Sequence, residues 1–182
     1  MGTTLSPMKM LKYLLLLLVL NTSLSSARVG TPATTAQLNP SEVLALLEKD
    51  GHPRFVALLK ETGLTSYFNK GRGTYLIPSE AYFESLTSQE YAHLKSKPEA
   101  LEAALQWHTL SQMLPLAQLS KVREVETVAG EMMDVEIVDE ELVVGGLTVV
   151  SGDLKGNGFV IHVVDDFQVE LDQDPLDMEE DV

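Results

Sequence analysis

The spacing of apolar residues changes once along this chain, near Val122, and this change limits the folds that the chain can adopt. Before that point apolar residues recur at helical spacing, as in Leu101, Ala104 and Leu105. After it, apolar and polar residues alternate in short runs bounded by glycine, which is typical of strands. Helices followed by a run of short strands predict an α+β domain with its helices on one side of a sheet or sandwich.

Capping patterns and turn residues locate several of these elements. The segments Asn39–Glu42, Thr87–Glu90 and Ser96–Glu99 each carry a cap residue three positions before a glutamate, which is the pattern of a capping box. Pro53 begins another predicted helix, which ends at Gly63. Strands are expected at residues 125–128, 135–138 and 147–150, separated by Gly130 and by a Gly145-Gly146 turn.

Two further apolar stretches lie near opposite ends of this region. Residues 74–83 predict a buried strand stopped by Pro78, with Ser79 placed to cap the helix that follows. Residues 158–166 predict a β-branched strand in which His162 alternates with its apolar neighbours and so faces the other side. We expect the His162 side chain to hydrogen-bond to a neighbouring element rather than to bind a metal.

The N-terminus has the layout of a secretory signal peptide. Two lysines precede an apolar run at residues 14–20, and Ser25 and Ala27 follow with the spacing of a cleavage site. The run is seven residues long, whereas a membrane span needs about 20. Residues 1–27 are therefore predicted to be removed, which leaves a secreted chain without membrane insertion; an uncleaved anchor is the alternative.

The rest of the chain divides into a leader, one domain and a tail. Residues 28–39 are small and polar and predict a flexible leader, residues 40–171 predict a single domain, and residues 172–182 predict an acidic, disordered tail. The chain has 13 basic and 27 acidic side chains and a net charge of −14. This charge disfavours nucleic acid and anionic membranes as partners, because both would repel it.

The residue types that support catalysis are missing or badly spaced. The chain has no cysteine, which excludes a thiol nucleophile and requires a core that forms without disulfides. Glycine pairs occur in hairpin contexts, so no phosphate-binding loop is indicated. We expect no enzymatic activity, no cofactor and no metal, since close metal-ligand spacing is absent among His52, His93, His108 and His162.

Three segments together resemble a known family. Residues 74–83, the Trp107-His108 step and residues 158–166 are similar to the two end motifs and the central Tyr-His motif of the fasciclin-like domain, with a likeness over about residues 40 to 171. The resemblance implies a compact β-sandwich or wedge flanked by helices, in an extracellular, adhesive and non-enzymatic protein. The positions that match the structural motifs are Pro78, Ser79, Phe83, Gly130, Gly146 and His162.

The resemblance also implies where a partner would bind. In adhesive matrix members of the family the Tyr-His and Asp-Ile steps have been proposed as integrin contacts. The matching positions here are Trp107-His108 and Asp153-Leu154, with Trp107 in place of tyrosine and Leu154 in place of isoleucine. The expected partner is therefore an extracellular protein, such as an integrin-like receptor, or a glycan.

Two alternatives stay open. His108 shares an apolar helix face with Leu101 and Leu105, which favours a structural role, and Asp153 suits a turn-stabilising acceptor. Some algal fasciclin-like proteins bind carotenoids, so the resemblance also allows a secreted carrier of a hydrophobic, carotenoid-like small molecule.

Overall fold

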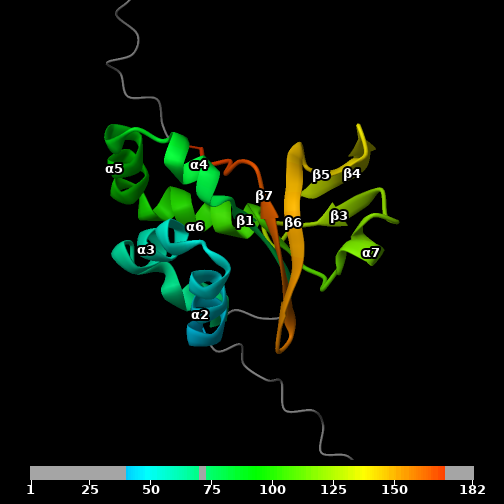
Figure 1. Cartoon of the computed structure of the whole chain (residues 1–182), viewed down its shortest axis with the longest axis horizontal. Helices are drawn as coiled ribbons and strands as arrows, with labels where there is room; N and C mark the ends of the chain where they lie inside the picture. Colours follow the sequence, from blue (N-terminus) through cyan, green and yellow to red (C-terminus); the bar gives the residue numbers. More distant parts are fainter. Residues whose placement is uncertain (1–39, 70–72, 171–182) are drawn as a thin grey trace, which may run out of the picture. The chain divides into compact units, whose positions relative to one another are not determined.

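The computed structural model describes residues 40–69 and 73–170 of the chain (Figure 1). The chain divides into two units, Met1–Thr35 and Ala36–Val182, and all described residues belong to the second unit. The expected signal peptide, leader and acidic tail, together with the Asn39 cap, lie outside the described residues. No helix within residues 40–69 and 73–170 is long and apolar enough to cross a membrane.

Helices dominate the first half of the described chain, as the helical spacing predicts. Proline at the first position begins α2, α3 and α6, where its missing N–H costs nothing and its fixed φ suits the helix. The helices are α2 (Pro40–Asp50), α3 (Pro53–Glu61), the 3-10 helix η1 (Leu64–Asn69), α4 (Glu80–Ser85), α5 (Ser88–Ser96), α6 (Pro98–Trp107) and the short α7 (Leu116–Leu119).

The strands form one seven-stranded sheet in the order β2-β1-β7-β6-β5-β4-β3. Strands β1 and β7 run parallel, and every other neighbouring pair is antiparallel. The α+β prediction is confirmed. The strands are β1 (Gly73–Pro78), β2 (Thr109–Leu110), β3 (Glu124–Glu126), β4 (Met132–Val138), β5 (Glu141–Val144), β6 (Leu147–Gly156) and β7 (Phe159–Val164).

The two ends of this sheet meet, so that the sheet curls into a near-barrel. A bridge pairs Leu110, at the end of β2, with Thr127, just after β3. Two backbone hydrogen bonds flank the bridge: the Ser111 N–H donates to Glu126 O over 3.0 Å, and the Val128 N–H donates to Thr109 O over 2.7 Å. Both outer strands of the sheet therefore have partners for part of their backbone, which reduces the exposed edge.

Strand β7 lies between two apolar layers, and all six of its residues are buried. Ile161 and Val163 point into a helix-side cluster, and Val164 points into a barrel cluster on the opposite face. Figure 1 shows helices α2 to α6 gathered on one side of β1 and β7, with β3 to β5 on the other. The helix-side cluster includes Phe55, Phe68, Phe83, Leu101, Ile161 and Val163, and the barrel cluster includes Leu76, Leu110, Val135, Val144, Leu147 and Val164.

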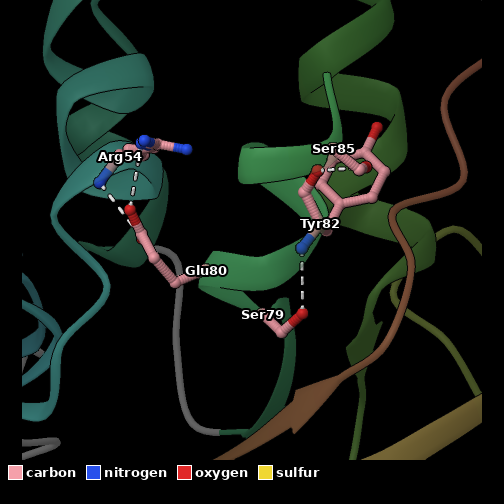
Figure 2. A network of polar contacts seen from close by, with 5 residues as sticks. All are labelled: Arg54, Ser79, Glu80, Tyr82 and Ser85. Carbon is pink, nitrogen blue, oxygen red and sulfur yellow. Dashed lines mark hydrogen bonds and ion pairs between the residues drawn. The ribbon is translucent and has the colours of Figure 1, made fainter.

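Polar contacts fix the start of α4 and join it to α3 (Figure 2). The Tyr82 N–H donates to Ser79 Oγ over 3.2 Å, so the predicted cap at Ser79 is present. Glu80 Oε1 lies 3.3 Å from Arg54 Nε, and its other oxygen accepts from the Arg54 N–H over 3.4 Å. This pair connects the N-termini of two helices that lie far apart in sequence. Both charges are partly exposed, so their main effect is on geometry rather than on stability.

One of the two remaining capping boxes is wrong. At Thr87 both bonds of the box are present: Thr87 Oγ1 accepts from the Glu90 N–H, and Glu90 Oε2 accepts from the Thr87 N–H. Ser96 instead ends α5 and donates its hydroxyl to His93 O over 2.7 Å. Lys97 is the N-cap of α6 and makes no capping bond through its side chain. Pro98 takes the first helical position, which places the N-cap at Lys97 rather than at Ser96.

Candidate functional site

Asp153 lies at an irregularity in β6, where the register with β7 shifts on both sides of Ser151. Its backbone is left-handed, with a φ of 63°. Asp153 Oδ1 accepts from the Leu116 N–H over 3.0 Å, and Oδ2 lies 3.3 Å from Lys155 Nζ. The hydrogen bond from Leu116, with Lys155 nearby, holds the pKa of this carboxyl below its usual range. The partly exposed carboxylate thus holds the first residue of α7 against β6.

His162 is fully buried beside this irregularity. Its Nε2 lies 2.9 Å from Leu114 O, and its Nδ1 accepts from the Asp153 N–H over 3.2 Å. A carbonyl can only accept, so the proton is on Nε2 and the ring is neutral. Burial lowers the pKa of His162 and favours this neutral form. The imidazole therefore links β7 to the segment before α7 and to the backbone of β6.

Gly152 leaves the space that this histidine occupies. A Cβ atom at residue 152 would lie 2.5 Å from His162 Nδ1 and 3.0 Å from Leu116 Cδ1. Contacts that short do not occur without a shift of the neighbouring atoms. The absence of a side chain at this position is thus what lets β6 and β7 approach around the ring.

Trp107 is the last residue of helix α6, and His108 is its C-cap. Trp107 is partly exposed and packs against the barrel cluster. His108 is 1% exposed, and its ring lies 4.7 Å from that of Phe167 in the helix-side cluster. His108 Nε2 accepts from the Gln168 N–H over 3.1 Å, and its backbone O accepts from the Leu76 N–H over 2.8 Å. Burial lowers the pKa of His108 to about 4, so the ring is neutral at pH 7.

The structure does not join the two predicted contact pairs. Within the described residues, no hydrogen bond, ion pair or ring contact connects Trp107 or His108 with Asp153 or Leu154. Leu154 packs against the helix-side cluster, whereas Asp153 faces His162 on the other side of β6. The two pairs are therefore separate places on the domain.

The other motif residues lie at turns and element ends. Pro78 is the last residue of β1, and Phe83 is buried in α4 with its ring 6.2 Å from that of Phe55. Gly130 and Gly146 lie in the β3–β4 and β5–β6 turns with φ of 85° and 83°, values that favour glycine. Phe83 also lines a surface hollow of about 610 Å³ together with residues of α3 and α5. Among the described residues, no group of three or more histidine, aspartate or glutamate side chains could hold a metal ion.

A groove of about 600 Å³ opens beside Trp107, and no sequence pattern predicts it. Its walls come from α6, from the turn between β3 and β4, and from the segment that follows β7. The lining includes Ala103, Trp107, Glu131, Phe167, Val169 and Glu170. These residue types are ordinary at surface positions and form no motif, so only the fold brings them together.

The family comparison agrees with this architecture. The model of the fasciclin domain family matches residues 50–169 of this chain. The chain therefore belongs to the fasciclin domain family. Fasciclin domains are typically non-catalytic and adhesion-related, and they often occur at cell surfaces or outside cells. Membership thus supports a general role as an interaction module.

Two proteins are similar to this chain over most of the domain. Protein sll1483 of Synechocystis sp. (strain ATCC 27184 / PCC 6803 / Kazusa) is 28% identical over 149 residues, which cover 80% of this chain and 81% of that protein. A solved FAS1 domain pair from the insect cell adhesion molecule Fasciclin I is 15% identical, with a TM-score of 0.42 over 69% of this chain. The match spans 43% of the length of that structure.

Proposed function

We propose that this chain is a secreted module for adhesion or matrix interaction, which binds an extracellular protein or glycan and catalyses no reaction. The observation that carries the proposal is the fasciclin domain match across residues 50–169. The geometry of the two central histidines supports the non-catalytic part. His108 and His162 are buried and hydrogen-bonded to backbone groups, so neither ring can reach a substrate without local unfolding.

Two surfaces are the proposed contact places. Around Asp153 the carboxylate is partly exposed and suits a cation or a basic group of an integrin-like receptor. Around Trp107 the indole faces the groove, while His108 lies behind it and supports it at a ring distance of 5.0 Å. Leu154 contributes packing under the first surface, since it lies against the helix-side cluster.

Removing the charge of Asp153 tests the first surface. The Asp153→Asn variant keeps an oxygen that can accept from the Leu116 N–H, so the free energy of unfolding should change by less than about 1 kcal/mol. Attachment of cells or matrix components to the immobilised domain should fall. Asp165→Asn is the matched control, because Asp165 Oδ1 accepts from the Thr148 N–H over 2.8 Å in the same way. Equal attachment by the two variants and the unchanged protein would remove Asp153 from the contact.

Secretion is a separate part of the proposal, and it has its own test. The lysine-flanked apolar run at residues 14–20 followed by Ser25 and Ala27 supports cleavage after Ala27. N-terminal sequencing of the native protein should therefore give a first residue near Arg28. Native protein that retains Met1 inside the cell would contradict secretion without affecting the fold.

A carrier of a hydrophobic small molecule is the second candidate. The observation that favours it is the groove beside Trp107, because about 600 Å³ falls within the range of small-molecule sites. Phe167 and Val169 supply apolar lining. A carrier of a carotenoid-like ligand should show visible absorbance when it is purified from its native source, and colourless protein that supports attachment would favour adhesion.

A further inference from the structure

Hydrogen bonds fix the backbone of two walls of the groove beside Trp107. The turn from β3 to β4 is closed by the Thr127 N–H donating to Glu131 O over 2.8 Å and by the Glu131 N–H donating to Thr127 Oγ1 over 3.1 Å. The segment after β7 is held to α6 by the Gln168 N–H donating to His108 Nε2. These bonds position Glu131 on one wall and the residues around Gln168 on another.

The lining combines an aromatic floor with acidic edges. The partly exposed ring of Trp107 lies beside small side chains of α6, Ala100 and Ala103, which leave the space above it open. The charged residues that line the groove are Glu131 and Glu170, and both are exposed. Among the described residues that line it, none is a lysine or an arginine. The site therefore offers an electron-rich ring face and negative charge to any occupant.

We propose that this groove binds an arginine side chain from a basic segment of a partner protein. A guanidinium stacks on an indole and donates to carboxylates in the plane of its fork, so Trp107, Glu131 and Glu170 complement it in shape and in charge. The net charge of −14 attracts basic partners at long range. This inference rests on the proposed function, since it names the chemistry of the partner that an interaction module would recognise.

Other occupants fit the lining less well. A purely apolar molecule would cover Glu131 and Glu170 without pairing them. The two carboxylates would then lose hydrating water and gain no hydrogen bond, which costs binding free energy. An acidic segment or a second copy of this acidic chain would be repelled. Lysine would satisfy the charge and can lie over a ring, as Lys95 does over Tyr91, but its ammonium group is a hydrated point charge that does not donate in a planar fork.

The groove contains its own reporter, because Trp107 is the only tryptophan in the chain. Fluorescence of the full chain is measured while a capped pentapeptide with one arginine between glycines is added up to about 10 mM, a range suited to a weak contact by a single side chain. We expect a saturable change in emission. The same peptide with citrulline, which keeps the shape and removes the charge, should give no saturable change.

Two substitutions test whether the carboxylates of the groove bind the arginine side chain. Glu131→Gln and Glu170→Gln should each raise the Kd for the arginine peptide by about two- to fivefold, as expected for the loss of one partner of an exposed ion pair. Glu136→Gln is the matched control, since Glu136 is an exposed residue of β4 that does not line the groove. It removes the same charge and should leave the Kd unchanged.

Three results would overturn the inference. They are the absence of a saturable signal with arginine, equal binding of the citrulline peptide, or an equal effect of Glu136→Gln and Glu131→Gln. Binding of an apolar dye without binding of arginine would also overturn it and would favour the carrier. Because attachment of cells is measured separately, attachment without arginine binding rejects this inference alone. Arginine binding without attachment rejects the proposed function and keeps the site.

Discussion

Replacing His162 with alanine should lower the free energy of unfolding by about 3–5 kcal/mol. The ring is fully buried, and its removal leaves a cavity between β6, β7 and the segment before α7. It also leaves Leu114 O and the Asp153 N–H without partners, and buried groups that lose a partner bear the full cost of desolvation. Urea denaturation followed by circular dichroism at pH 7 measures this loss.

His93→Ala is the matched control for this substitution. His93 lies on α5, is only partly buried, and makes no side-chain hydrogen bond among the described residues. Its replacement should cost less than about 1 kcal/mol. If His162→Ala cost no more than His93→Ala, the hydrogen-bonded histidine would not be what holds β6 and β7 to the segment before α7.

The stability of the domain should fall as the pH is lowered from about 6.5 to about 4, and His108 should account for much of the loss. Burial lowers the pKa of His108 in the folded chain to about 4 from its ordinary value of 6.5. Between these values the unfolded chain binds a proton that the folded chain does not. The contribution of neutral His108 to the free energy of unfolding is therefore complete above pH 6.5, and it is lost progressively as the pH approaches 4. One pKa unit corresponds to 1.36 kcal/mol, so the loss amounts to about 3 kcal/mol.

The His108→Gln variant isolates this contribution. Glutamine offers an oxygen to the Gln168 N–H but does not titrate in this range. The difference in free energy of unfolding between the unchanged protein and the variant should shrink by about 3 kcal/mol from pH 7 to pH 4. Carboxylates and His162 titrate in both proteins, so the difference removes their effect. Two parallel pH profiles would show that His108 is not responsible.

The sequence predicted those features that depend on local patterns. The apolar run before Pro78 and the β-branched run around His162 both became buried strands, since period and propensity act within each segment. The cap at Ser79 was also predictable, because the acceptor and the N–H that it satisfies lie three residues apart. The same local pattern predicts a box at Ser96 that the structure lacks, because Pro98 takes the first helical position and places the N-cap at Lys97.

The features that the sequence did not show depend on segments that meet only in the folded chain. Alternation indicated which way His162 faces, but nothing near it in sequence identified Leu114 O as its partner. The hydrogen bond from Leu116 to Asp153 likewise joins α7 and β6, which are far apart in the sequence. The groove beside Trp107 needs three separate segments, and its glutamates look like any exposed acid. Such contacts carry no periodic or motif signal.

The parallel pairing of β1 with β7 affects how a ribosome can produce this domain. Strand β1 emerges early, and β7, which covers its other edge, is the last strand among the described residues. Until β7 is made, the apolar side chains of β1 and of the preceding helices have no complete layer to pack against. The core of the domain therefore cannot form completely before β7 has been made, which favours late folding during synthesis.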